Sequence, residues 1–211
     1  MHPMKSLLTL TITAAMLAPL AAQAHPKAGD FLVRGRAIHV SPDESDNTLN
    51  PVGGKAHVGS DTVPEVDLSY FFTDNIAVEV IAATTKHDAK GKGIPGLGDI
   101  HAGSTRVLPP TVTLQYHFTN WEDFKPYVGA GLNYTMFYDE KAGAAGSLDI
   151  DNAFGYALQA GVDVPLDEHW SWNLDVKKLY VKADASWSGG AIRSDMDLDP
   201  WIIGTGVGYT F

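Results

Sequence analysis

The sequence predicts an all-β protein, an eight-stranded antiparallel β-barrel that spans a membrane. Eight segments alternate apolar and polar side chains with a period of two, as strands do between lipid and a barrel interior. The connections between the segments alternate strictly between long and short, and the last segment carries aromatic residues at both ends. The segments are 31–40, 63–72, 76–84, 110–118, 126–138, 152–164, 170–181 and 201–211.

The lengths of the connections predict the orientation of the barrel. Outer-membrane barrels have short periplasmic turns and long extracellular loops. The long connections in this chain are 41–61, 85–109, 139–151 and 182–195. We therefore expect these four to be extracellular loops, and an even strand number places both ends of the mature chain in the periplasm. A secreted β-sandwich is the alternative, but it requires no rule about which turns are long.

The first residues of the chain predict export. Lys5 supplies a positive start, 7–20 form an apolar run, and Ala22-Gln23-Ala24 is a typical cleavage motif. We expect a signal peptide over 1–24 that is removed after Ala24, and a barrel over 25–211. A membrane anchor is a weaker interpretation, because the run falls short of about 18 apolar residues.

The composition excludes several classes of function. The chain has no cysteine, so it has neither disulfides nor thiolate sites. A formal net charge of -10 argues against nucleic acid as a partner. Asp195, Asp197 and Asp199 resemble half of a calcium loop without its glycine and glutamate, so a divalent ion shared with lipopolysaccharide is an alternative. We expect no cofactor and no metal site.

The closing segment predicts how the barrel sits in its membrane. Trp201 is expected at the outer headgroup level, and Tyr209 and Phe211 at the inner one, as aromatic girdles require. A terminal Phe211 after alternating apolar residues resembles the sequence that the barrel assembly machinery binds. The glycines of this segment face inward and leave space for side chains of other strands.

The seventh segment departs from strict alternation at Lys178, which the pattern would place in lipid. Two explanations are open. A β-bulge near Lys177 and Lys178 would turn the side chain inward. Alternatively, Lys178 lies at the outer rim and extends its ammonium group to the headgroups.

The polar faces of the segments predict a salt-bridged plug in the periplasmic part of the lumen. An eight-stranded barrel is just wide enough to be filled by side chains, so charges inside it should pair. An ion-conducting path is the alternative. The predicted plug residues are Arg34, Arg36, Asp67, Glu79, His117, Asp163, Asp175 and Lys177, with Gln115, Asn133, Gln159 and Asn173 beside them.

The long connections carry apolar residues that predict either a binding surface or a self-packed cap at the extracellular mouth. They are Leu49, Val52, Ile94, Leu97, Ile100, Leu108, Leu148 and Ile150, with Phe154 at the start of the sixth segment.

Four prolines begin strands that run down from the extracellular side: Pro64, Pro109, Pro110 and Pro200. Proline removes a ladder donor. These residues either mark ordinary strand starts or weaken the pairing enough to open a lateral gap.

Five stretches resemble the OmpW family of outer-membrane proteins in their order and spacing. They are TDNIAVE at 73–79, LPPT at 108–111, KPYVGAGLNY at 125–134, QAGVD at 159–163 and LDPW at 198–201. The resemblance implies a narrow pore for small, mainly hydrophobic solutes with a lateral exit to the membrane, and a pore-narrowing role for Phe154.

These observations predict a protein of the outer membrane of a Gram-negative bacterium, with outer-membrane lipid, lipopolysaccharide, the barrel assembly machinery and small hydrophobic solutes as partners. We expect an uptake channel. In this interpretation Phe154, Leu97, Ile100, Leu108 and Leu148 form the apolar mouth. The alternatives are a structural or surface-interaction barrel without transport and, less favoured, a lipid-modifying enzyme.

Overall fold

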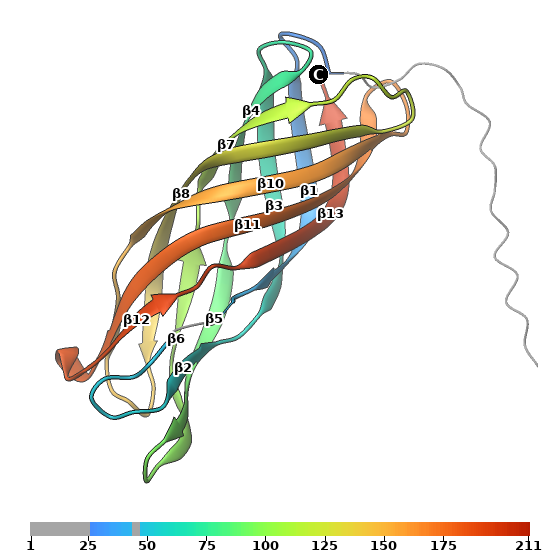
Figure 1. Ribbon diagram of the computed structural model, residues 1–211. Helices are drawn as coiled ribbons and strands as arrows, with labels where there is room; N and C mark the ends of the chain where they lie inside the picture. The colour runs from blue at the N-terminus through green and yellow to red at the C-terminus, as the bar shows by residue number, and fades with distance from the viewer. Residues whose placement is uncertain (1–25, 44–46) are drawn as a thin grey trace, which may run out of the picture.

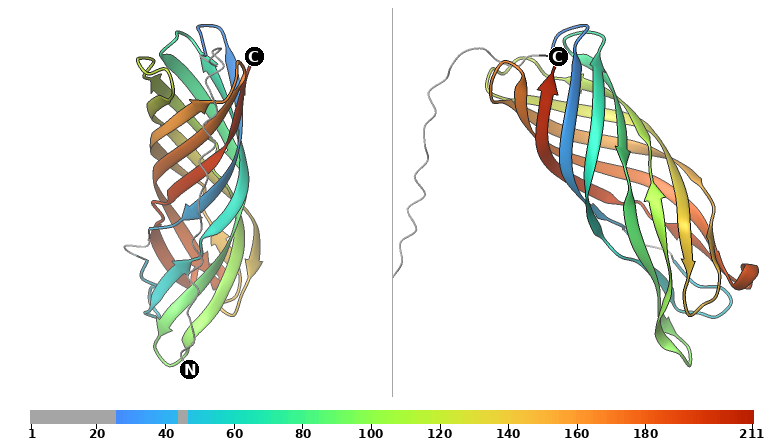
Figure 2. Two further views of the ribbon diagram at one scale, coloured as in Figure 1. Left: turned by 90° about the vertical axis from the view of Figure 1, so that its right-hand side faces the viewer. Right: turned by 180° about the vertical axis from the view of Figure 1, so that it is seen from behind.

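The computed structural model describes residues 26–43 and 47–211, so the predicted signal peptide and its cleavage after Ala24 lie outside the described residues. Within them the predicted fold class is confirmed. Eight antiparallel strands form one elongated closed barrel with strongly tilted strands (Figures 1 and 2). In ladder order they are β1 (Phe31–Ser41), β3 (Asp61–Phe71), β4 (Ile76–Ala83), β7 (Thr111–His117), β8 (Lys125–Ala142), β10 (Ala153–Pro165), β11 (Trp170–Trp187) and β13 (Trp201–Thr210).

The first and last strands close the barrel. β13 pairs with β1 from Leu32↔Thr210 to Ser41↔Trp201, and its other edge pairs with β11. Its side chains alternate as expected, since Trp201 and Ile203 face outward and Ile202 is buried. The C-terminus lies at the end of the barrel with the short connections, which we call the turn end; we call the opposite end the hairpin end (Figure 1).

Much of the chain that was expected to form long loops continues the strands. The range 85–109 is a β-hairpin that extends beyond the other connections (Figure 1), and β11 runs six residues past the predicted end at Val181. In these extensions the side chains still alternate, but the outward residues are charged rather than apolar. The predicted segments were defined by rows of apolar, lipid-facing residues and therefore end before the strands do. The further elements are β2 (Lys55–Val58), β5 (Thr85–Ile94), β6 (Gly98–Leu108), β9 (Leu148–Ile150), β12 (Ile192–Asp197) and the 3-10 helix η1 (Ser188–Gly190).

The bulge considered near Lys178 is wrong. β11 pairs without a register shift with both β10 and β13 through this residue. Lys178 faces outward opposite Trp201, and its Nζ donates to Asp43 Oδ2 at 3.1 Å and to the Asp199 carbonyl at 2.6 Å. The ammonium group is thus held at the outer rim, as the second explanation requires.

Among the residues that the structure describes, none of the helices has the length and apolar composition of a membrane-spanning helix.

Candidate functional site

Midway along the barrel the lumen changes from polar to apolar, and we call the two sides the polar half, toward the turn end, and the apolar half, at the hairpin end. At the turn end itself, Leu32, Phe71 and Ala77 form a small apolar cluster below the polar side chains. In most strands the inward residue on one side of the level where the lumen changes is charged or polar, and the next inward residue is apolar. In β7 and β8 the first inward residue on the hairpin side of this level is instead polar, Thr111 and Thr135 respectively. The polar and apolar members of these pairs are Arg36 and Ile38 in β1, Glu65 and Val63 in β3, Glu79 and Ile81 in β4, Gln159 and Ala157 in β10, and Lys177 and Leu179 in β11.

Arg34 is the centre of the polar half. Its guanidinium binds Asp163 with two hydrogen bonds, from Nε at 3.0 Å and from Nη2 at 2.7 Å. Its Nη1 donates to Asp67 Oδ1 and to Ser69 Oγ, each at 3.1 Å. The Arg34 side chain is fully buried, so this two-pronged geometry holds a cation in the interior of the barrel.

Arg36 continues the network toward the apolar half. Its Nε donates to Glu65 Oε1 at 2.9 Å, and its Nη2 lies 2.8 Å from Asp67 Oδ2 and 3.3 Å from Glu79 Oε1. All of these side chains are nearly or fully buried. Together with the Arg34 group, they fill this level of the lumen with paired charges.

Several members of the polar half were not among the predicted plug residues, and Glu65 and Tyr127 are two of them. The Tyr127 hydroxyl donates to Asp175 Oδ2 at 2.7 Å, and its ring stacks on His117 with centroids 4.9 Å apart. A Cβ at Gly161 would lie 2.4 Å from that hydroxyl, so glycine is needed there for space. Strict alternation from Gly129 back along the fifth segment would have placed Tyr127 inward.

All eight predicted plug residues lie in this polar half, and each is buried. Their inward-facing neighbours Gln115, Asn133, Gln159 and Asn173 are buried as well. The closing strand provides room, because a Cβ at Gly208 would lie 3.1 Å from Arg34 Cγ.

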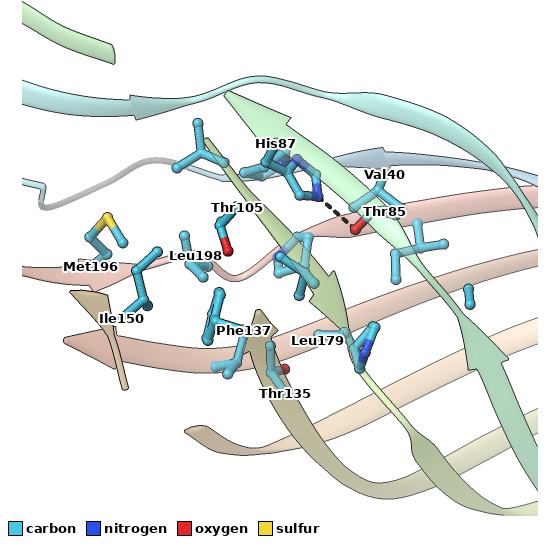
Figure 3. A pocket seen from close by; sticks show the side chains of 18 of the residues that line it. Val40, Thr85, His87, Thr105, Thr135, Phe137, Ile150, Leu179, Met196 and Leu198 are labelled. Carbon is cyan, nitrogen blue, oxygen red and sulfur yellow. Dashed lines mark hydrogen bonds between the residues drawn. The ribbon is translucent and has the colours of Figure 1, made fainter. Parts of the chain in front are cut away.

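The apolar half contains a cavity of about 80 Å³. Its floor is formed by Lys177 and Glu65, and Leu179 and Ile38 form the wall above them. His87 is a polar residue in this wall, and one of its ring nitrogens hydrogen-bonds Thr85 Oγ1 at 2.8 Å (Figure 3). Further apolar lining comes from Val40, Phe137, Ile150, Met196 and Leu198 (Figure 3).

Trp187 separates this cavity from the outside. It lines the cavity on one side and, on the other, a hollow of about 360 Å³ between the hairpin tips. Its side chain is 1% exposed, and its indole Nε1 donates to the Ala102 carbonyl at 3.1 Å. Sequence reasoning missed Trp187, although alternation continued from Lys177 would have placed it inward.

The residues expected at the apolar mouth are not all there. Phe154 is 81% exposed on the outer surface of β10 and contacts Tyr134, so the expectation that it narrows the pore is wrong. Its position has the same parity as the lipid-facing Tyr156 and Leu158. Leu97 is 69% exposed at the tip of the β5–β6 hairpin.

The other expected mouth residues divide between the cap and the outer surface. Leu108 is not among the cavity-lining residues, whereas Val107 and Pro109 on either side of it are. Leu148 is buried, and Ile100 packs against the same cluster. This cluster joins Leu49, Ile94 and Ile150 to Trp187, so these loop residues form a self-packed cap that also lines the hollow.

The four prolines do not lie together. The ladder between β3 and β4 stops at Glu65↔Ala83, one residue before Pro64, whereas the ladder between β1 and β3 runs on to Val40↔Asp61. Pro109 and Pro110 separate β6 from β7, and Pro200 is buried between β12 and β13. Pro64 thus lies within β3, not at its start, and borders an interruption in the wall.

This interruption forms a short window between β3 and β5. It ends at Glu65↔Ala83 on one side and at Val58↔Ala89, where β2 pairs with β5, on the other. Side chains bridge the window, since Asp61 Oδ2 accepts the Lys86 amide at 3.0 Å and His87 Nδ1 hydrogen-bonds the Gly59 carbonyl at 2.7 Å. At its edge the Gly59 amide also donates to the Asp88 carbonyl at 3.3 Å. Val58, Ala83 and His87 also line the cavity.

A second seam lies between β8 and β9. The ladder between β8 and β10 ends at Thr135↔Ala153. Beyond it, Glu140 Oε1 accepts the Ile150 amide at 3.1 Å and Asn152 Oδ1 accepts the Phe137 amide at 3.0 Å. Burial and the nearby Asp149 and Asp151 raise the pKa of Glu140, while the Ile150 hydrogen bond opposes this shift.

Comparisons with known proteins agree with this architecture. The OmpW family model matches residues 27–211. Outer membrane protein W of Vibrio cholerae is 39% identical over 196 residues, which cover 87% of this chain and 89% of that protein. The dibenzothiophene metabolism operon protein PahQ of Pseudomonas aeruginosa is 30% identical over 75% of this chain and 76% of its own. The crystal structure of the outer membrane protein OprG from Pseudomonas aeruginosa has a TM-score of 0.78 at 32% identity, and the match covers 90% of this chain and 99% of OprG.

Proposed function

The chain belongs to the OmpW family and is a barrel of the outer membrane of a Gram-negative bacterium, and from this premise we propose that it takes up small, mainly hydrophobic molecules. The turn end is then periplasmic and the hairpin end extracellular. A solute enters from the outer hollow past Trp187, occupies the cavity of the apolar half, and leaves sideways into the membrane.

The observation that carries this proposal is the change of the lumen from apolar to charged at a single level. The cavity ends on Lys177 and Glu65, and below them Arg34 and Arg36 are paired in buried networks. An apolar solute cannot replace those ion pairs without leaving buried charges uncompensated, which is very unfavourable. The lateral window at Pro64, which the cavity lining reaches, is closed by two hydrogen bonds between backbone and side chain and by one backbone bond at its edge, so it is the exit that we propose.

One relative supports apolar solutes as the class to test first. PahQ is named for an operon of dibenzothiophene metabolism, and dibenzothiophene is a fused aromatic compound with little polarity. The apolar lining of the cavity agrees with the same class.

Uptake of radiolabelled n-octane tests the proposal. A Gram-negative host without its own family member should take up octane faster with this chain in its outer membrane than with an empty vector. Equal initial rates, with the barrel folded in the outer membrane, would contradict the channel function.

A crosslink tests the exit separately. The chain has no cysteine, so Thr62→Cys with Lys86→Cys, both outward-facing at the window, can be joined by a short bis-maleimide. We expect the lock to bring octane uptake close to the vector level. His39→Cys with Thr62→Cys, cross-strand partners in the intact ladder, is the matched control and should retain uptake. If the crosslinked Thr62→Cys, Lys86→Cys variant still takes up octane, the exit lies at another seam, such as β8–β9.

The second candidate is a structural or surface-interaction barrel, favoured by the protruding β5–β6 hairpin and its exposed Leu97. It predicts no octane uptake above vector. Under either candidate we propose the same contacts with the envelope. Phe211, exposed at the chain end, is offered to the assembly machinery, and Trp201 with Lys178 to lipopolysaccharide at the outer rim.

A further inference from the structure

The floor of the cavity carries an ammonium group with unused hydrogen-bonding capacity. Lys177 is 2% exposed. Its Nζ lies 3.7 Å from Glu65 Oε2 and 3.7 Å from Asp175 Oδ1, which are ion-pair contacts too long for hydrogen bonds. Arg34 and Arg36 differ from it, because their N–H groups donate to carboxylates at hydrogen-bond distance.

The surroundings of Lys177 make this unusual. Lys177 lines the cavity, and Ile38, Leu179 and Ile202 in the same lining form an apolar wall around the floor. A buried donor that lacks an acceptor lowers stability, and a charged donor does so more strongly. A polar atom supplied by a molecule in the cavity would therefore be bound strongly at this point.

Glu65 supplies an acceptor beside this donor. Its Oε1 accepts from Arg36 Nε at 2.9 Å, whereas its Oε2 lies 3.7 Å from Lys177 Nζ. Glu65 also lines the cavity. The floor therefore presents a donor and an acceptor side by side, both facing an apolar chamber.

We propose that Lys177 and Glu65 form a head-group subsite, which binds apolar molecules that end in a neutral hydroxyl in preference to plain hydrocarbons. The hydroxyl oxygen accepts a hydrogen bond from Lys177 Nζ, and the hydroxyl group donates one to Glu65 Oε2. The alkyl chain lies along Ile38, Leu179 and Ile202. This inference rests on the proposed access of solutes to the cavity and adds which of them are held there.

The charge balance selects a neutral head group over an anionic one. The carboxylates outnumber the cations in the cluster below the cavity, so a carboxylate on the ligand would add repulsion. The carboxylates are Glu65, Asp67, Glu79, Asp163 and Asp175, and the cations are Arg34, Arg36 and Lys177.

The test compares 1-hexanol, n-heptane and hexanoate, which separate the head group from the chain. The barrel in lipid nanodiscs carries ¹³C-labelled isoleucine methyl groups. Ile38, Ile81 and Ile202 report from the cavity, and Ile203, which faces lipid, reports on partitioning into the bilayer. We expect hexanol to bind about tenfold more tightly than heptane, in line with a hydrogen bond to a charged group, and hexanoate to bind more weakly than hexanol.

Variants identify the residue responsible. Lys177→Met should lower the affinity for hexanol to that for heptane, and Lys182→Met, an exposed lysine on the outer face of the same strand, should leave it unchanged. The double variant Lys177→Met with Glu65→Gln removes one charge of each sign and keeps the test valid if the single variant does not fold. Equal binding of hexanol and heptane to the native barrel, or unchanged hexanol binding in both Lys177 variants, overturns the subsite while uptake of apolar solutes stands. If neither ligand shifts the cavity methyl groups, the proposed access to the cavity fails as well.

Discussion

In the polar half of the lumen, long side chains cross the barrel and bind one another, whereas the apolar half leaves a cavity between shorter ones. Arg34 reaches Asp163, which is 129 positions away in the chain, and Tyr127 reaches Asp175. The same strands carry Ile38 and Leu179 a few residues further along, and these contact a chamber rather than a partner. The difference therefore lies in the side chains, not in the strands that bear them.

The walls of the two halves differ in the same sense. The ladders around the polar half are continuous and in register, for example from Leu32↔Ser69 to Arg36↔Glu65. Around the apolar half the wall is interrupted between β3 and β5 and between β8 and β9, where side chains bridge the strands. We infer that the polar half is a rigid floor and that the openings required by the proposed uptake lie in the apolar half.

The largest effect should come from removing the central cation of the floor. Arg34→Leu leaves Asp163 buried without its cation and Asp67 with only Arg36, so we expect the barrel to lose about 3–5 kcal/mol of stability toward denaturant. Arg106→Leu is the control, because Arg106 lies half-exposed beside Asp139, and an exposed pair contributes about 1 kcal/mol or less. Similar losses in the two variants, measured by unfolding in guanidinium from lipid vesicles, would show that the polar half is no more critical than the surface.

A smaller effect is expected from the cap of the apolar half. Trp187→Phe keeps an aromatic ring between the cavity and the outer hollow but removes the hydrogen bond to the Ala102 carbonyl. The loss of stability should be about 1 kcal/mol, the usual contribution of one hydrogen bond, while the initial rate of octane uptake rises. Trp172→Phe, a change on the lipid-facing surface of the same strand, is the control for expression and assembly. An uptake rate below that of the native barrel would contradict this expectation. It would mean that the Trp187 indole helps solutes to enter and does not hold the cap closed.

The sequence predicted the polar half better than the apolar half for a physical reason. Charged residues at alternate positions next to apolar ones can only face inward in a membrane strand, so Arg34, Asp67 and Lys177 were identifiable from period two alone. Outside the membrane that contrast disappears. Lys86 and Asp88 face outward as charged residues while Thr85 and His87 face inward, and the range was therefore expected to be a loop. The error at Phe154 has another cause. The alternation of its strand already placed this residue on the lipid-facing side, but the role implied by the family resemblance was preferred.

The smallest expected effect is a pH dependence of the β8–β9 seam, where Glu140 has a raised pKa because of burial and the neighbouring Asp149 and Asp151. A carboxyl group with a raised pKa holds its proton more tightly in the folded barrel than in the unfolded chain. The stability that Glu140 contributes is thus fully present below its ordinary pKa of 4.5, and it is lost as the pH rises through the pKa of the folded state. The seam should therefore loosen with rising pH, seen as faster hydrogen exchange of the Ile150 amide relative to Glu140→Gln at each pH. The floor should not follow this change, so the Asp175 amide, inside a continuous ladder, is the internal reference. If the ratio of the Ile150 exchange rates in the native barrel and in Glu140→Gln stays constant as the pH rises above 4.5, the seam opens independently of Glu140.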